Sequence, residues 1–360
     1  MEENQPTGAT IRIACNSGVK NTVLSNARGI VALLSNMARG EGTEETSILI
    51  KIVSMDISRI RHYVKDLQNC LKKSTFSRSE LSLRITKHQS GTSFQPLDSF
   101  FEWLDYISAL GELDCENTES LVQFLRHSQR AKHDYADLLN AAFSTNAGHL
   151  EKWVLIILKL GRYGIASRAF FQIVIELPAL FDPMNVESVP VRGKTPIYTR
   201  ELNLVRVLRR LVGSKEDECL RRLQHIWKGK GDPQNYFLHQ CPTHLTVHAE
   251  LQLVGFYDEN PERIPSFRFI GVSKKSCYLC DRFLALHPLS FTTSACHQKL
   301  YSTWATPSTR NNKSYDLYKS IATKLIGIME VCIKEELDRR PNFHTNLYHP
   351  ILPQEFRFPA

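Results

Sequence analysis

A short run of residues in the second half of the chain constrains its fold and chemistry more than any other feature. His248-Ala249-Glu250 is followed, after one predicted strand, by a Cys-x-x-Cys pair, Cys277 and Cys280. One imidazole and two thiolates are three zinc ligands, whereas structural zinc sites usually have four protein ligands. Three ligands with a separate carboxylate are typical of a metal that activates water. The spacing therefore predicts a catalytic Zn²⁺ centre.

Local patterns place these residues at the starts of two helices. A strand is expected from Pro242 to Val247, and the residues after it have apolar side chains at helical spacing, so that His248 lies in the first turn. A second strand is expected over 267–272, and Ser276 is predicted to cap a helix that begins at Cys277. Since strand–helix units put helix N-termini at one edge of a parallel sheet, the three ligands are expected to converge there.

Other interpretations of these residues stay open. A Cys-x-x-Cys pair alone also occurs as a redox pair or as half of a structural zinc site. Cysteine nucleophile chemistry would leave the second cysteine and Glu250 without a role. Cys296 or His297 would close the fourth zinc position in a structural module that binds nucleic acid or a protein partner, which is our second hypothesis. A metal-binding but inactive relative is the third. His244 and Cys241 are expected to be strand residues rather than ligands.

The same residues resemble a known family. The segments that carry the resemblance are Thr243–Glu250, Phe269–Ser273, Cys277–Cys280 and Cys296–Trp304. Together they are similar to the fungal branch of the cytidine-deaminase-like superfamily, whose members are regarded as nucleic acid or nucleotide deaminases. The superfamily signature is H-x-E followed by P-C-x-x-C, with a zinc-activated water that attacks C4 of cytosine or C6 of adenine. The resemblance extends over roughly residues 236 to 335, about the size of one domain.

The resemblance implies roles for individual residues. His248, Cys277 and Cys280 would hold Zn²⁺, and Glu250 would take a proton from the water and return protons to the ring nitrogen and the leaving ammonia. The implied activity is hydrolytic deamination of cytosine or adenine in a nucleotide or in DNA or RNA, such as nucleic acid editing of a single strand. Position 276 is Ser where many members have Pro; since both residues start helices well, we expect the site to be kept.

Aromatic residues near the motif are candidates for substrate binding. Tyr301 and Trp304, with His297, lie in a polar and aromatic segment that the resemblance puts beside the pocket. Aromatic rings stack on bases in nucleic acid sites. A tryptophan is nevertheless more often a core or rim residue, because Trp is highly buried on average.

The length of 360 residues predicts more than one domain. We predict a mainly α-helical N-terminal domain over residues 1–182, a linker with connecting helices over 183–235, a zinc-dependent domain over 236–338 and a tail over 339–360. The resemblance implies an α/β/α sandwich with a mixed sheet for the third part. Its first strand is expected either at 236–238 or at 188–192. Apolar periodicity predicts helices over 46–71, 97–113, 120–143, 150–160, 165–180, 200–212, 215–227 and 315–337, with polar linkers at 74–82 and 88–96.

Composition limits the location and the partners. The net charge of +8 and the arginines and lysines of the two connecting helices are compatible with phosphate binding, although Glu216, Asp217 and Glu218 fit a solvated surface equally well. Nine cysteines without framework spacing argue against a secreted disulfide protein. The chain begins without a signal-peptide pattern, and its apolar stretches are interrupted by charges. We therefore expect an intracellular protein, cytoplasmic or nuclear, with no membrane partner.

Overall fold

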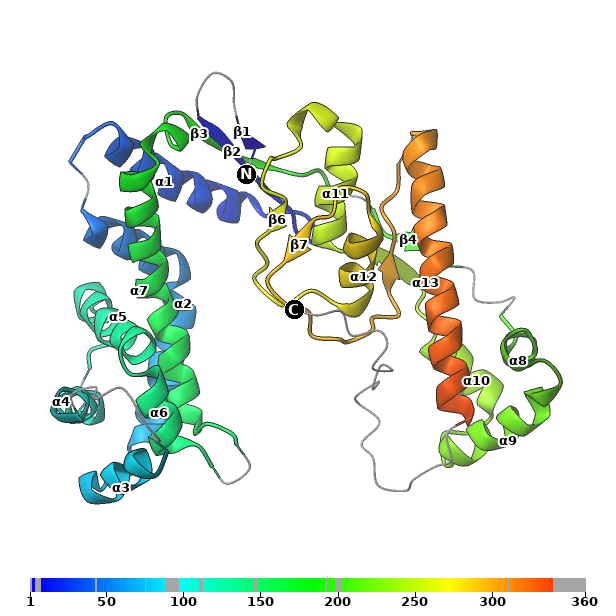
Figure 1. Cartoon of the computed structure of the whole chain (residues 1–360), viewed down its shortest axis with the longest axis horizontal. Helices are drawn as coiled ribbons and strands as arrows, with labels where there is room; N and C mark the ends of the chain where they lie inside the picture. The colour runs from blue at the N-terminus through cyan, green and yellow to red at the C-terminus, as the bar shows by residue number, and fades with distance from the viewer. Residues whose placement is uncertain are drawn as a thin grey trace. The chain divides into compact units, whose positions relative to one another are not determined.

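The computed structural model describes residues 2–3, 8–42, 44–74, 76–88, 97–109, 113–145, 148–191, 193–197, 202–309 and 311–338. Within these ranges the chain divides into two compact units (Figure 1). The helical unit takes in residues 8–9 and 22–186, and the mixed unit takes in 2–3, 10–21 and 187–338. The predicted tail, 339–360, lies outside the described residues, and the four-part division stays a prediction.

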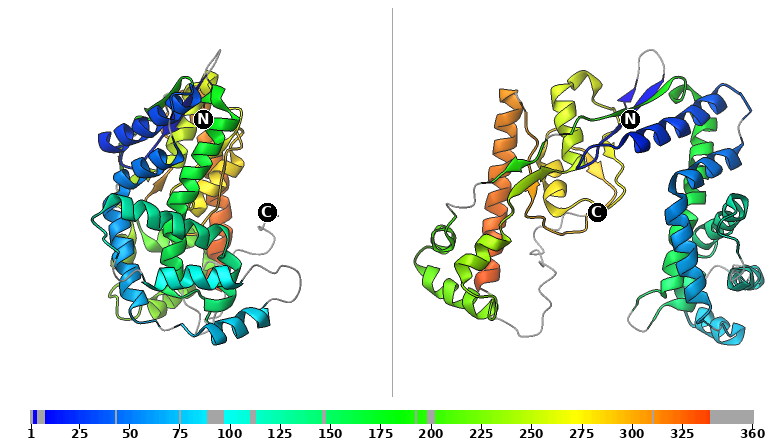
Figure 2. Two further views of the ribbon diagram at one scale, coloured as in Figure 1. Left: turned by 90° about the vertical axis from the view of Figure 1, so that its left-hand side faces the viewer. Right: turned by 180° about the vertical axis from the view of Figure 1, so that it is seen from behind.

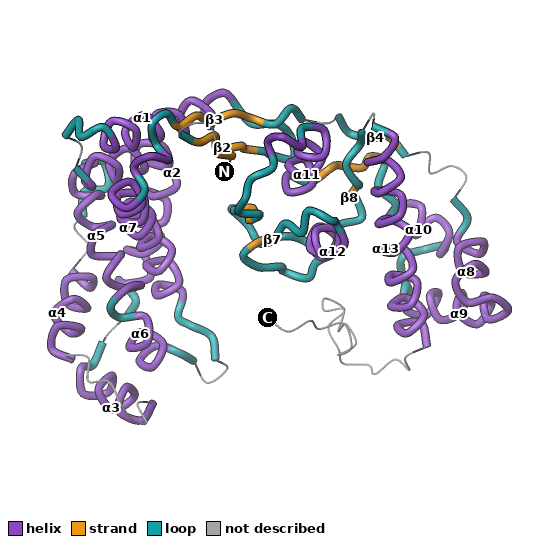
Figure 3. Tube along the Cα trace, turned by 45° about the horizontal axis from the view of Figure 1, so that its top comes forward, coloured by secondary structure: helices purple, strands orange, loops and turns teal. Residues whose placement is uncertain are grey.

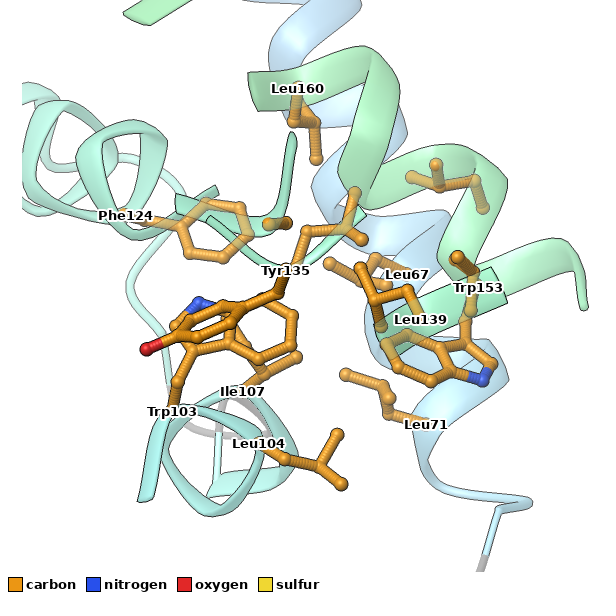
Figure 4. Packing of buried hydrophobic residues seen from close by; sticks show 14 of the residues in the cluster. Leu67, Leu71, Trp103, Leu104, Ile107, Phe124, Tyr135, Leu139, Trp153 and Leu160 are labelled. Carbon is orange, nitrogen blue, oxygen red and sulfur yellow. The ribbon is translucent and has the colours of Figure 1, made fainter. Parts of the chain in front are cut away.

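The helical unit is formed by amphipathic helices around one apolar core. Its helices are α1 (Asn21–Ala38), α2 (Glu45–Leu71), α3 (Arg78–His88), α4 (Leu97–Ser108), α5 (Thr118–His133), α6 (Ala136–Phe143) and α7 (Lys152–Glu176), followed by the short 3₁₀ helix η2 (Pro178–Leu180). Helices α2, α5 and α7 lie side by side (Figures 1 and 2). Figure 4 shows Leu67 of α2, Trp103 of α4 and Tyr135 at the start of α6 among the side chains of this core.

Four features of this unit differ from the sequence predictions. The helix predicted over 120–143 is two helices, α5 and α6. Helix α1 was not predicted, and α3 begins at Arg78, inside the predicted linker 74–82. The helices predicted over 150–160 and 165–180 are one continuous helix, α7. Gly161 does not break α7 because it lets α5 approach closely: a Cβ at this position would lie 2.3 Å from the Ser128 carbonyl oxygen. Close packing therefore outweighs the low helix propensity of glycine.

The mixed unit contains short strands and six described helices (Figure 3). The helices are α8 (Leu204–Val212), α9 (Glu216–Ile226), α10 (Pro233–Gln240), α11 (Ala249–Glu259), α12 (Tyr278–Leu286) and α13 (Asn312–Asp338), with 3₁₀ helices η4 (Gly213–Lys215) and η5 (Pro261–Arg263). The strands β4 (Thr195–Pro196), β5 (His244–Val247) and β8 (Trp304–Ala305) form a sheet in the order β4–β5–β8. Because β4 is antiparallel and β8 parallel to β5, the sheet is mixed.

The remaining strands form two further sheets. Strands β6 (Phe269–Ile270) and β7 (Thr292–Thr293) pair in parallel. Strands β1 (Glu2–Glu3), β2 (Ala9–Ile13) and β3 (Met184–Ser188) form a three-stranded sheet in the order β1–β2–β3. No helix in the described ranges is both long and apolar enough to cross a bilayer.

The strand that precedes β5 in the sheet is β4, which lies upstream of α8 and α9, as one of the two predictions placed it, but at 195–196 rather than 188–192. The other predicted position, 236–238, belongs to helix α10. The Asp232 side chain caps this helix by accepting a hydrogen bond from the Asn235 N–H at 2.9 Å, and Pro233 occupies its first turn. Asp followed by Pro is a helix-start signal, and it decides the conformation of this segment.

A buried polar network joins the three helices around the core of the mixed unit. Asp258 of α11 accepts hydrogen bonds from the Tyr318 hydroxyl of α13 and from His287 Nε2, at the end of α12, at 3.1 Å. His287 Nδ1 accepts a bond from the Leu289 N–H, which leaves the ring proton on Nε2. The side chains of His287 and Asp258 are only 1% and 11% exposed, so a lost partner would not be replaced fully by water.

Replacing Tyr318 with Phe is expected to lower the free energy of unfolding of the mixed unit by about 1–2 kcal/mol, because it removes one hydrogen bond to a buried carboxylate. The measurement is chemical denaturation followed by circular dichroism. Tyr315→Phe on the same helix is the matched control, since Tyr315 is 58% exposed. Equal stabilities for the two variants would show that the network does not stabilise the unit.

Candidate metal centre

His248 and the two cysteines come from the N-termini of neighbouring helices. His248 is the N-cap residue of α11 and directly follows β5. Cys277, rather than the predicted Ser276, is the N-cap of α12, and its Sγ accepts a hydrogen bond from the Cys280 N–H at 3.4 Å. The positive ends of both helices therefore face the site, an arrangement that stabilises thiolates.

The distances between the three ligand atoms fit a zinc ion. His248 Nδ1 lies 3.4 Å from Cys277 Sγ and 3.4 Å from Cys280 Sγ, and all three atoms lie within 4.8 Å of one another. Tetrahedral ligands with Zn–N near 2.0–2.1 Å and Zn–S near 2.3 Å are about 3.5–3.8 Å apart. The two thiols are buried, and His248 is half-buried. The group is thus a possible metal site with soft ligands.

The three side chains are electrostatically coupled. Hydrogen bonds from the Cys280 thiol and from His248 lower the pKa of Cys277 to about 4. The hydrogen bond between the two sulfurs holds the proton on Cys280 and, with burial, raises the pKa of that thiol. The Cys277 thiolate in turn raises the pKa of His248. The interactions within the group therefore favour the thiolate form of Cys277 over that of Cys280.

Glu250 lies beside this group without belonging to it. It is in the first turn of α11 and half-buried, and its charge acts on both His248 and Cys280. Within the described residues, the group of possible ligand atoms contains only the histidine and the two cysteines. The structure thus brings a carboxylate close to three ligands while leaving it available for proton transfer.

Cys296 and His297 lie in a loop that follows the Cys-x-x-Cys turn, and neither joins the ligand group. Cys296 Sγ accepts a hydrogen bond from the Gln298 N–H at 3.3 Å, and His297 Nδ1 accepts one from the Lys299 N–H at 3.0 Å. Both side chains are engaged within their own loop. A fourth protein ligand is therefore not assembled among the described residues.

One of the predicted substrate-binding residues, Tyr301, lies against the histidine ligand and also contacts His297. The Tyr301 ring meets His248 edge to face at 5.7 Å and meets His297 in the same manner, also at 5.7 Å. Tyr301 is 44% exposed, so part of its ring is accessible at the site. Trp304 is half-buried and packs edge to face against Phe283 of α12. The Tyr301 ring thus contacts His248 directly, and His297 contacts the Tyr301 ring.

Ser276 fixes the loop to the ligand turn. Its N–H donates to the Ala295 carbonyl at 2.9 Å, its hydroxyl lies 3.1 Å from both Ala295 O and Thr293 Oγ1, and its carbonyl accepts from the His297 N–H. The residue is fully buried. Serine therefore contributes hydrogen bonds that a proline at this position would not provide.

Ser276→Pro is expected to destabilise the mixed unit by about 2–3 kcal/mol, although proline is the residue in the signature that this sequence resembles. The reason is that the Ala295 carbonyl and Thr293 hydroxyl, both close to the buried Ser276, would lose their partner. The measurement is thermal unfolding, with Asn312→Pro at the exposed first position of α13, where proline is well tolerated, as the control for a new proline. An unchanged melting temperature in Ser276→Pro would contradict the prediction.

The sequence did not indicate that the N-terminal segment reaches this site. The Asn16 side chain accepts a hydrogen bond from the Ala249 N–H at 2.8 Å, and the Gln252 side chain donates to the Cys15 carbonyl at 3.2 Å. Asn16 therefore satisfies one of the open N–H groups of α11, between His248 and Glu250. No local pattern predicts such a contact across more than two hundred residues.

The remaining candidates lie apart from the ligand group. His244 is exposed in β5 and is 2.9 Å from the Thr243 hydroxyl, whereas Cys241 is the C-cap of α10 and not a strand residue. On the basic helices, Arg209 pairs with Glu216 and Arg210 with Glu330. These pairs neutralise part of the predicted phosphate-binding surface.

Comparisons with known proteins agree with the geometry of the site. A family model described as OTT_1508-like deaminase matches residues 247–308, which contain His248, Glu250 and both cysteines. Neither the comparison with curated proteins nor that with solved structures gave a significant match. The segment that holds the candidate metal site is therefore similar to a deaminase family.

Proposed function

We propose that the protein is a zinc-dependent hydrolytic deaminase acting on a nucleobase, cytosine or adenine, in a nucleotide or a nucleic acid. The observation that carries the proposal is the group of His248, Cys277 and Cys280 with Glu250 beside it and outside it. Such a set leaves one coordination position open, as catalytic zinc requires. The match of the same segment to a deaminase family supports the reaction type.

In this proposal His248, Cys277 and Cys280 hold the metal. Zinc bound there supplies Lewis-acid activation of water at neutral pH. Glu250 would accept one proton of the attacking water and give it to the ring nitrogen, then accept the second proton of the same oxygen and give it to the amino group, which leaves as ammonia. Its half-buried position at the N-terminus of α11 keeps the carboxylate close to the reacting atoms. Asn16 orients the start of α11 through the Ala249 N–H.

The substrate base is proposed to lie against Tyr301 and His297. The Tyr301 ring contacts both His248 and His297, and its exposed part offers a face for stacking. If the substrate is a polymer, we propose single-stranded DNA or RNA, because a base within a duplex must first be unstacked. The substrate role predicted for Trp304 stays a prediction.

The proposal includes a family and a fold. We infer that the domain is a cytidine-deaminase-like α/β/α sandwich related to the fungal branch of that superfamily. Supporting features are the mixed sheet, the two helix N-termini at the site and the His-x-Glu and Cys-x-x-Cys motifs. All nine cysteines are free, as expected in the reducing cytoplasm or nucleus.

The competing hypothesis is a structural zinc module in which Cys296 is the fourth ligand. Hydrogen bonding of Cys296 within its own loop, outside the ligand group, favours the catalytic proposal. An inactive relative would bind zinc without turnover, so activity and metal content must be measured on the same sample.

The test is ammonia release by protein of known zinc content, with single-stranded DNA, single-stranded RNA, nucleosides and nucleotides as substrates. We expect release from at least one of these classes, and identification of the deaminated base by mass spectrometry. Release must disappear in the variant Glu250→Gln with its zinc retained. A zinc-loaded wild type that is inactive on every one of these four substrate classes would refute the proposal.

A further inference from the structure

Trp304 lies directly behind the candidate metal site. It begins β8 and pairs in register with Thr246 of β5, two residues before His248. Its ring meets Phe283 edge to face at 6.2 Å, and Phe283 follows Cys280 by three residues on α12. The indole is thus held between the strand that leads to the histidine ligand and the helix that carries the cysteine ligands.

The indole N–H of Trp304 is buried without a hydrogen-bond partner among the described residues. The other tryptophans with buried rings are paired: Trp103 donates to the His127 carbonyl at 3.0 Å, and Trp153 donates to the Glu151 carboxylate at 3.0 Å. Buried indole N–H groups usually find an acceptor. The unpaired Trp304 donor therefore needs an explanation.

The Cys280 sulfur is the candidate acceptor for this N–H. The Trp304 side chain interacts with the Cys280 thiol, although the pair does not meet the geometry of a hydrogen bond. A neutral thiol is a weak acceptor, whereas cysteine bound to a metal is a thiolate with a full charge. A Cys280 thiolate that ligates zinc would therefore offer this buried N–H a strong acceptor, which the neutral thiol does not.

We propose that Trp304 is a positioning residue of the metal site, whose indole N–H donates a hydrogen bond to the zinc-bound thiolate of Cys280. This inference rests on the proposed zinc site, and it goes beyond that site by naming the residue that neutralises part of the ligand charge. Groups that hydrogen-bond to metal ligands commonly contribute 10–100-fold to metal affinity. It also gives Trp304 a role different from stacking on a substrate base.

The test compares wild type with Trp304→Phe, which keeps an aromatic ring against Phe283 and removes the N–H. Zinc affinity is measured by competition with a chelator, and we expect the dissociation constant to rise by about 10–100-fold. The second readout is the sulfur-to-metal charge-transfer band of the Co²⁺-substituted protein. Loss of a donor raises the energy of the sulfur lone pairs, so this band is expected to shift to longer wavelength.

Two controls separate the hydrogen bond from packing. Tyr318→Phe removes a buried hydrogen bond elsewhere in the same unit and is expected to leave the Co²⁺ spectrum unchanged. Benzothienylalanine introduced at position 304 keeps the shape of the indole and lacks only the N–H. It must reproduce the spectral shift, and it provides the test if Trp304→Phe does not fold.

The outcomes distinguish the two proposals. A wild type that binds neither Zn²⁺ nor Co²⁺ would refute the metal site itself and the inference with it. A wild type that binds both metals, with unchanged affinity and spectrum in the folded position-304 variants, would refute only the role of Trp304. Weaker zinc binding with a shifted band would support it, whatever the substrate of the enzyme is.

Discussion

Glu250→Gln is expected to reduce deamination by about 10²–10⁴-fold while the protein keeps its zinc. Glutamine has nearly the same shape but can neither accept the water proton nor return it, and proton transfer by a positioned side chain commonly contributes this much to a rate. Metal binding is expected to persist because Glu250 lies outside the group formed by His248, Cys277 and Cys280. The measurement is turnover on the substrate found by ammonia release, together with zinc content by atomic emission.

Glu259→Gln is the matched control, since Glu259 is the exposed last residue of the same helix. It is expected to keep wild-type turnover. If Glu250→Gln retained full activity, another group would have to carry the proton. If it lost zinc, Glu250 would be a ligand and the site would resemble a structural centre.

The grouping of His248, Cys277 and Cys280 was predictable because these residues lie close together in sequence and have distinctive chemistry. His248 and Glu250 lie in one turn, and Cys277 and Cys280 lie in another. Each pair follows a segment that was predicted to be a strand, so local rules were enough to bring helix N-termini to the same place. The N-cap residue of α12 is Cys277, one residue after the predicted Ser276. The reason is that the Cys277 sulfur itself accepts a hydrogen bond from the Cys280 N–H, as a serine cap would.

The surroundings of the site were not predictable in the same way, because they depend on contacts between distant segments. Asn16 meets Ala249, and β4 pairs with β5 across a long connection. Neither contact leaves a periodic pattern in the sequence. The two-residue strands β4 and β8 are too short to show alternation, and only their pairing with β5 defines them.

The partners of buried polar groups were also not predictable from the sequence. Ser276 looks from the sequence like an ordinary helix cap, yet it is a buried residue that hydrogen-bonds a loop about twenty residues later. Asp258 and His287 resemble surface residues by type, but with Tyr318 they form a buried network between three helices. The chemistry of a residue suggests what it can do, while its partners are set by tertiary packing.

The second large expected effect is that bound zinc stabilises the folded protein. Cys280→Ala should abolish tight zinc binding, because only two of the three ligands, His248 and Cys277, remain in this variant. A ligand that binds only the folded protein stabilises it by about 4 kcal/mol at a concentration 1,000 times its dissociation constant. We therefore expect zinc to raise the melting temperature of wild type and to leave that of Cys280→Ala unchanged, as measured by calorimetry.

Cys296→Ala is the decisive comparison, since Cys296 is the fourth ligand in the structural hypothesis. The Cys296 sulfur accepts a hydrogen bond from the Gln298 N–H within its own loop. We therefore expect Cys296→Ala to keep zinc and the zinc-dependent rise in melting temperature. Equal loss of zinc in Cys280→Ala and Cys296→Ala would establish a closed site with four protein ligands, in which water could not be activated. Zinc retained in Cys296→Ala and lost in Cys280→Ala leaves the fourth position to water, and it is this open position that hydrolytic deamination requires.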